Sequence, residues 1–113
     1  MAKIIKIPSV FVYDTKVVGV SKDNEDGTSR QEIIQQEVAE DDKLQLEPEP
    51  TNPYDSNAIK VLSRHGNQIG YLNREIAEKV RLAVDNQTEI HVTVKWVNGE
   101  KMLGVGLRIE LVS

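Results

Sequence analysis

The chain has 113 residues, 14 Lys and Arg against 18 Asp and Glu, and no cysteine. A chain of this length forms one domain with its own hydrophobic core, so we expect a single domain over residues 1–113. The lack of cysteine excludes a disulfide scaffold and every cysteine-based metal or thiol site. With only His65 and His91 as imidazole ligands, we expect no metal and no cofactor.

The formal net charge of −4 is distributed unevenly along the chain. Residues 22–55 carry 11 acids and 3 bases, whereas the rest of the chain carries 7 acids and 11 bases. A basic body beside an acidic segment permits contact with nucleic acid or with a basic protein. The overall charge therefore argues only against a protein that coats DNA non-specifically.

The first ten residues, MAKIIKIPSV, have no extended apolar core followed by a cleavage site, and the longest apolar runs in the chain are short. We therefore expect neither a signal peptide nor a transmembrane helix. This predicts a cytoplasmic protein without a membrane partner.

The N-terminal part is predicted to contain a strand, a loop and a short helix. Residues 10–20 are rich in β-formers and predict a strand, and residues 21–28 form a polar loop. Ser29 and Glu32 match a capping box, which begins a helix. Few apolar residues follow, so we expect this helix to lie on the surface and to end near residues 40–42.

A half-buried strand and a hairpin come next. Residues 43–49 alternate between apolar and polar side chains, and prolines end the strand. Residues 51–56 are rich in turn-forming side chains. Strands at 58–63 and 68–72, joined by His65-Gly66-Asn67, predict a β-hairpin.

The C-terminal part is predicted to contain a helix and a second hairpin. Asn73 suits the N-cap of a helix that runs to about Asp85 and packs its apolar stripe on a sheet. Asn98-Gly99 between two β-like runs indicates a two-residue turn. The expected apolar pairs are then Val94 with Leu103, Val92 with Val105 and Ile90 with Leu107.

The other face of this hairpin is predicted to carry little side-chain bulk. Gly104 and Gly106 are expected opposite Thr93 and His91, which permits a sharp bend or the close approach of a partner. We expect Trp96 to share the face of Val92 and Val94 and to pack at the core or its rim rather than to stack on a ligand.

These elements predict a mainly β protein with two helices. About six antiparallel strands in a chain of this length fit a small barrel, closed or nearly closed, better than a sandwich. We therefore expect an OB-like or SH3-like antiparallel β-barrel.

The densest polar cluster, at residues 49–61, has two interpretations. In the first it is a structured turn, in which Asp55 and Asn57 cap local amides and Tyr54 covers the core edge. In the second, Tyr54 stacks on a nucleic-acid base and Asp55 accepts a hydrogen bond from a free sugar hydroxyl. A carboxylate repels phosphate, so such a site favours an uncharged strand end.

The same cluster resembles the HIRAN domain, in the free-standing form found in bacteria. The resemblance extends over about residues 17–112. The stretches that carry it are NPYDSNAIKV at 52–61, GNQIGYL at 66–72, EIA at 75–77, VGV at 18–20 and GTSRQE at 27–32.

The resemblance implies an OB-like barrel with two helices that captures the 3′ hydroxyl end of single-stranded DNA. Tyr54 would stack on the terminal base, Asp55 would accept from the 3′ hydroxyl, and Asn52 would assist. Tyr71 would face the ligand and Arg74 would meet a backbone phosphate. The resemblance also implies a link to DNA repair or stalled-fork processing, with a helicase or repair protein as partner.

The bases between residues 60 and 81 are further candidates for DNA contact. They could line a groove or form a solvated face, and both interpretations stay open. Arg74 is the strongest candidate because phosphate would also meet the free amides of the helix start there. The bases are Lys60, Arg64, Arg74, Lys79 and Arg81.

Two other functions compete with DNA binding. A metal-dependent nuclease needs convergent carboxylates, whereas the consecutive acids at 40–42 point in different directions, so we expect no enzyme. A protein-interaction module would present the acidic residues 22–55 to a basic partner, or to the basic face of a second copy in an oligomer.

Overall fold

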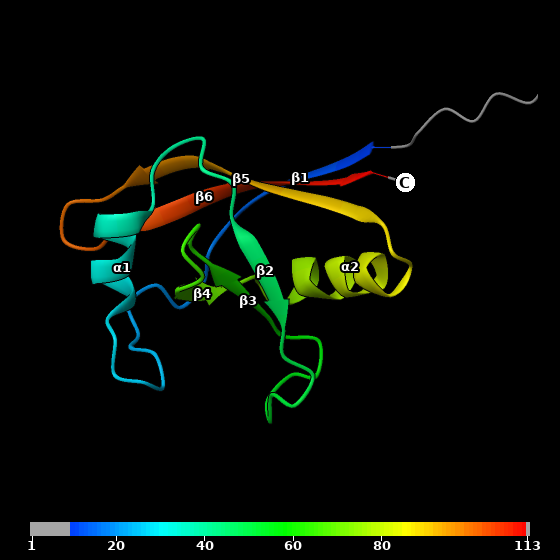
Figure 1. Ribbon diagram of the computed structural model, residues 1–113, viewed down its shortest axis with the longest axis horizontal. Helices are drawn as coiled ribbons and strands as arrows, with labels where there is room; N and C mark the ends of the chain where they lie inside the picture. The colour runs from blue at the N-terminus through cyan, green and yellow to red at the C-terminus, as the bar shows by residue number, and fades with distance from the viewer. Residues whose placement is uncertain (1–9, 113) are drawn as a thin grey trace, which may run out of the picture.

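The computed structural model describes residues 10–112 and is mainly β with two helices, as predicted (Figure 1). The prediction about a signal peptide concerns residues outside this range. Neither helix in the described range is long and apolar enough to cross a membrane. The elements are β1 (Val10–Lys16), α1 (Arg30–Glu37), β2 (Gln45–Pro48), β3 (Ile59–Leu62), β4 (Gln68–Tyr71), α2 (Arg74–Asp85), β5 (Glu89–Asn98) and β6 (Gly104–Val112).

The six strands form two antiparallel sheets of three strands, in the orders β1-β6-β5 and β2-β3-β4. Single bridges connect the sheets, between Val18 and Tyr71 and between Lys43 and Thr93. The expected strand number and antiparallel pairing are confirmed. Among residues 10–112 the strand pairing gives two three-stranded sheets, so the barrel stays a prediction.

The core lies between the two sheets. In Figure 1 the sheet β1-β6-β5 lies above the strands β2 to β4, with α1 at one side and α2 at the other. Alternate residues of β5 and β6 point inward, so that Val94, Val105 and Ile109 have no exposed surface. Each fully buried aliphatic side chain stabilises the fold by about 1.5–3 kcal/mol.

Helix α1 begins as predicted but is shorter than expected. The Ser29 hydroxyl accepts from the Glu32 amide at 3.2 Å. The helix ends at Glu37, because the next residue, Val38, has an extended backbone. The helix lies at the surface as predicted, with Glu32, Gln35 and Gln36 exposed, but its inner face is buried: Ile34 is completely buried, since α1 packs against β4 and covers one end of the core.

Helix α2 has the predicted bounds. The Asn73 side chain accepts from the Ile76 amide at 2.9 Å, and the helix ends at Asp85. Its stripe packs on the sheet through Val80, which is completely buried, whereas Val84 is partly exposed.

The register predicted for the C-terminal hairpin is wrong. Val94 pairs with Leu107, and a bulge separates Val94 from Trp96. The connection is longer than two residues because Gln31 of α1 holds Leu103, donating to its carbonyl at 3.0 Å and accepting from its amide at 2.8 Å. The partner of Val94 is displaced by four residues, an even number, so Val92 and Val94 still face the core and Ile90 still packs against it.

The bulge also moves Trp96 to the outer face. Gly104 and Gly106 pair with Asn98 and Trp96 rather than with Thr93 and His91. The Trp96 indole covers Gly106 so closely that a Cβ there would lie 2.2 Å from indole Cε2. The space above the glycines is therefore taken by the chain's own tryptophan.

A second close approach joins the two sheets at Gly70. Its φ is +155°, and a Cβ would lie 2.4 Å from the Val18 carbonyl oxygen and 2.5 Å from Val17 Cγ1. Val18 and Tyr71 exchange two backbone hydrogen bonds beside it, at 2.9 and 3.0 Å.

We expect Gly70→Ala to lower the free energy of unfolding by about 1–3 kcal/mol more than the strain of its positive φ alone, because the methyl group would push the segment at Val17 and Val18 away. Gly66→Ala is the control, since Gly66 has a φ of +84° but open space around a Cβ. Urea unfolding measures both. Equal destabilisation by the two substitutions would contradict the packing argument.

Candidate functional site

A shallow cleft of about 270 Å³ lies where the loop after β2 meets β4 and the start of α2. Five of the six predicted site residues line it, and the sixth, Lys60, lies outside its lining. Val18, Ala58 and Leu72 complete the wall. The predicted residues in the lining are Asn52, Tyr54, Asp55, Tyr71 and Arg74.

The loop that carries Tyr54 is held by side-chain hydrogen bonds. Asn52 Oδ1 accepts from the Tyr54 amide at 2.9 Å and from the Asp55 amide at 3.1 Å. Asp55 Oδ1 accepts from the Asn57 amide at 2.9 Å. The interpretation as a structured turn is therefore correct for Asp55, which caps a local amide.

The structured-turn interpretation required Tyr54 to cover the edge of the core, and it does not. The residue is 89% exposed. Its backbone is fixed by Asn52 while its ring is free, so the loop presents an aromatic surface to solvent. Such a surface suits stacking on a planar ligand.

Asp55 and Arg74 face each other across the cleft. Arg74 Nε lies 3.7 Å from Asp55 Oδ2, and the arginine side chain is 73% exposed. An ion pair this open stabilises the fold by at most about 1 kcal/mol. Arg74 is therefore open to a ligand phosphate, while the Asp55 side chain beside it is 23% exposed and partly buried.

Glu49, to which the sequence analysis gave no role, connects the cleft to the sheet. Its Oε1 accepts from Asn52 Nδ2 at 2.7 Å and from the Tyr71 hydroxyl at 3.1 Å, and its Oε2 lies 3.0 Å from Lys60 Nζ. Burial raises the pKa of Glu49, but the hydrogen bonds from Asn52, Lys60 and Tyr71 outweigh it and hold the pKa below its ordinary value.

Lys60 is thus already paired. Its hydrogen bond to Glu49 raises its pKa above the ordinary value, so it stays charged, but that charge is directed at the carboxylate. Lys60 lies opposite Tyr71 in the pairing of β3 with β4, and its ammonium contacts Glu49 rather than the cleft.

Arg30 is a second residue that the sequence analysis missed. It is 7% exposed, and its guanidinium lies 5.5 Å from the centroid of the Tyr71 ring. It donates to the Gly19 carbonyl at 2.9 Å and to Asn24 Oδ1 at 2.7 Å. Tyr71 is therefore held by a cation against its ring and a carboxylate at its hydroxyl. No local pattern signals this, because the contact joins α1 to β4.

The other bases do not join Arg74 in a continuous groove. Lys79 Nζ lies 5.2 Å from the centroid of the Tyr13 ring, and Arg81 pairs with Asp85 at 3.7 Å. Among residues 10–112, no group of three or more His, Cys, Asp or Glu side chains is arranged to hold a metal ion.

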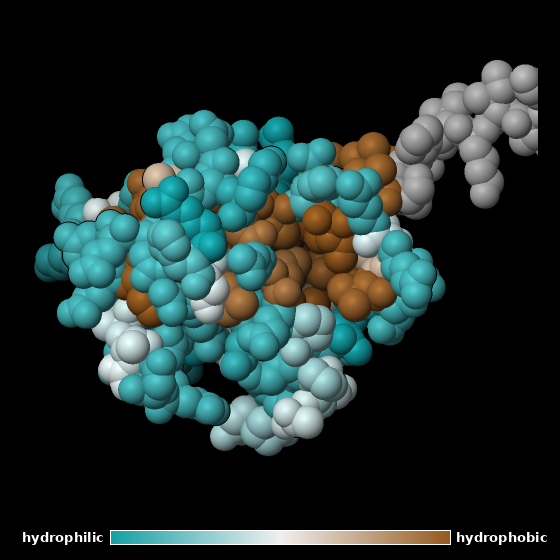
Figure 2. Space-filling view, in the orientation of Figure 1, coloured by the Kyte–Doolittle hydropathy of each residue, from teal (hydrophilic) through white to brown (hydrophobic). Residues whose placement is uncertain are grey.

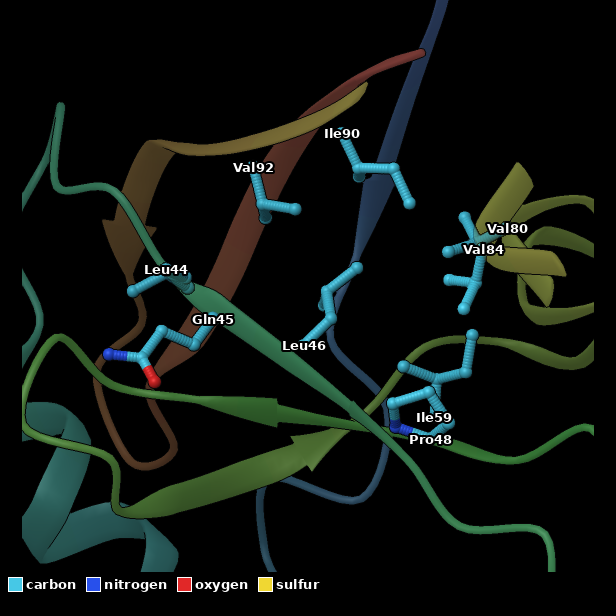
Figure 3. A pocket seen from close by; sticks show the side chains of 9 residues that line it. All are labelled: Leu44, Gln45, Leu46, Pro48, Ile59, Val80, Val84, Ile90 and Val92. Carbon is cyan, nitrogen blue, oxygen red and sulfur yellow. The ribbon is translucent and has the colours of Figure 1, made fainter. Parts of the chain in front are cut away.

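An apolar groove of about 340 Å³ opens on another part of the surface, between β2, α2 and β5. Figure 2 shows it as a brown hollow bordered by polar side chains, and in Figure 3 Leu46, Val80, Val84 and Ile90 surround it. No charged side chain lines it, so it offers nothing to a phosphate.

Comparison with known proteins identifies the family. The sequence model of the HIRAN domain matches residues 10–112. Helicase-like transcription factor from Mus musculus is 48% identical over 50 residues, which are 44% of this chain and 5% of that protein. The human protein is 42% identical over the same length. The chain thus spans a small part of the length of these relatives.

Solved structures agree over nearly the whole chain. The crystal structure of the HIRAN domain of human HLTF matches with a TM-score of 0.73 and 26% identity, over 94% of this chain and 79% of that one. The NMR structure of the HLTF HIRAN domain in its DNA-bound conformation has the same coverage, with a TM-score of 0.63 and 27% identity. A protein from Lactobacillus plantarum shares the fold, with a TM-score of 0.69 and 19% identity over 92% of this chain and 98% of that one. The chain belongs to the HIRAN domain family.

Proposed function

We propose that this chain is a non-catalytic module that binds single-stranded DNA at its 3′ hydroxyl end. The observation that carries the proposal is one cleft that combines the exposed ring of Tyr54 with the Asp55 carboxylate and the Arg74 guanidinium. The similarity to an HLTF HIRAN domain in its DNA-bound conformation supports DNA as the ligand.

Each group has a distinct task in this proposal. Tyr54 stacks on the terminal base, as aromatic side chains do in sequence-tolerant sites for single strands. Asp55 accepts a hydrogen bond from the 3′ hydroxyl and repels a phosphate at the same position. Arg74 contacts the nearest internal phosphate, close to the free amides at the start of α2.

The remaining predicted residues support these three. Asn52 holds the loop in the shape that places Tyr54 and Asp55, and Tyr71 forms the wall of the cleft. Lys60 acts through Glu49 rather than through DNA. The two carboxylates near the cleft, those of Glu49 and Asp55, serve binding and loop structure, and we assign no reaction to them.

The acidic segment is the basis of the alternative, a protein-interaction module. Several of its carboxylates have partners within the fold. Asp26 accepts from the Thr28 hydroxyl at 2.6 Å and Glu37 from Asn67 Nδ2 at 2.9 Å, and these bonds lower the pKa of both acids. These local roles account for part of the acidic charge without a basic partner, which favours DNA binding.

We further propose that the module works in a helicase or repair assembly, at stalled forks or other free ends. Relatives named as helicase-like contain the matched segment as 5% of their length. We propose that the two connected sheets serve as an OB-like barrel that presents the loop.

We expect labelled oligonucleotides ending in a 3′ hydroxyl to bind more tightly than the same strands ending in a 3′ phosphate or in a blunt duplex. Fluorescence anisotropy measures the three Kd values. Asp55→Asn should remove most of the preference for hydroxyl over phosphate, because it removes the charge while its Oδ1 can still accept from the Asn57 amide. Equal Kd values for all three ends of the wild-type chain would exclude end capture.

We expect Tyr54→Ala to weaken binding of the 3′ hydroxyl strand by about 1–3 kcal/mol, or roughly 5- to 150-fold in Kd, through loss of stacking. The melting temperature should stay near that of the wild type because the ring is exposed. Tyr54→Phe is the control and should bind nearly normally. An alanine variant with unchanged Kd would remove Tyr54 from the site.

We expect Arg74→Ala to weaken binding to all single-stranded ends and to reduce the slope of log K against log salt concentration by about 0.7, the value for one phosphate contact on a single strand. Arg64→Ala, an exposed base on the turn between β3 and β4, is the control and should leave the slope unchanged. A slope for Arg74→Ala equal to that of the wild type would show that Arg74 contacts no phosphate.

A further inference from the structure

We propose that Glu49 is the positioning residue of this site and determines its selectivity for the 3′ hydroxyl without touching DNA. The inference rests on the proposed function and adds a residue to it. Glu49 lies at the point where the loop leaves β2, and its carboxylate reaches side chains of the loop, β3 and β4.

The backbone of Glu49 fixes the base of the loop. Its amide donates to the Ala58 carbonyl at 2.8 Å, and its carbonyl accepts from the Asn52 amide at 3.0 Å. These two bonds fix the Glu49 backbone, from which the carboxylate extends, beside Ala58 at the end of the loop.

The carboxylate then selects one of two orientations of the Asn52 amide. A carboxylate only accepts hydrogen bonds, so the Asn52 group that faces Glu49 must be Nδ2, at 2.7 Å. This leaves Asn52 Oδ1 for the amides of Tyr54 and Asp55. A flipped amide would direct Nδ2 at these two donors and disturb the segment that carries the stacking ring and the carboxylate.

The same oxygen positions the wall of the cleft. Glu49 Oε1 also accepts from the Tyr71 hydroxyl at 3.1 Å, so one atom joins the loop to β4. Tyr71 and Asp55 both line the cleft. Displacement of the carboxylate would therefore change the distance between the wall and the acceptor of the 3′ hydroxyl.

Lys60 balances the charge of Glu49. Its ammonium lies 3.0 Å from Glu49 Oε2, whereas the ion pair of Asp55 within residues 10–112 is the longer one with Arg74, at 3.7 Å. Asp55 is therefore the less compensated of the two carboxylates, and the one whose charge discriminates against a terminal phosphate.

Glu49→Gln tests this arrangement, since it offers one acceptor oxygen to three donors. Glu47→Gln is the matched control: it removes the same charge from an exposed position on β2, opposite Lys60 in the ladder. Anisotropy titrations of each variant use strands ending in a 3′ hydroxyl and in a 3′ phosphate. We expect Glu49→Gln to lose at least fivefold in affinity for the hydroxyl end and less than twofold for the phosphate end, while Glu47→Gln keeps the wild-type ratio.

A double-mutant cycle with Asn52→Ala shows whether Glu49 acts through Asn52. If it does, adding Glu49→Gln to Asn52→Ala weakens hydroxyl-end binding less than twofold further. Fully additive losses, or equal losses for both ends together with a lowered melting temperature, would overturn the proposal.

If Glu49→Gln folds poorly, Tyr71→Phe is the second test. It removes the hydroxyl that donates to Glu49 and keeps the aromatic ring in the wall of the cleft. We expect a smaller loss of the same preference, and an unchanged preference would count against Glu49. If the wild-type chain itself shows no preference, both the proposed function and this inference fail. If the wild-type chain prefers the 3′ hydroxyl end and Glu49→Gln keeps that preference, the proposed function stands and the proposed role of Glu49 is wrong.

Discussion

The backbone pairing of Val18 with Tyr71 holds the two sheets together beside the cleft. It exists because Gly70 has no Cβ, which would otherwise lie 2.4 Å from the Val18 carbonyl oxygen. Tyr71 is fixed by this pairing, and the N-cap Asn73 and Arg74 follow directly in the chain. The wall of the cleft and the guanidinium of Arg74 thus depend on one close approach between two segments far apart in the sequence.

The site combines a rigid support with free ligand groups. Asn52, Glu49 and Lys60 use their polar atoms within the protein, whereas Tyr54 and Arg74 extend into solvent. Preorganisation of this kind reduces the entropy lost on binding. In the described chain the other cations of α2, Lys79 and Arg81, contact other side chains.

The sequence predicted those features that depend on residues close together in the chain. The bounds of α2 follow from its Asn73 cap, and the resemblance of residues 52–61 to the HIRAN domain led to the cleft. Three features depended on contacts between distant residues and were not predictable: the hairpin register, set by Gln31 with Leu103; the complete burial of Ile34 in α1; and the connection of Glu49 to Tyr71. Glu49 stands between Pro48 and Pro50, and nothing in this local sequence indicates that its carboxylate contacts β3 and β4.

The most direct test of the central claim is amide chemical-shift mapping of the full chain by NMR, with a short strand ending in a 3′ hydroxyl. The account predicts the largest changes in the segment from Asn52 to Asn57 and around Tyr71 and Arg74, with little change at Trp96 or along the groove between β2, α2 and β5. Changes concentrated on the acidic loop at residues 21–28, or on that groove, would contradict it.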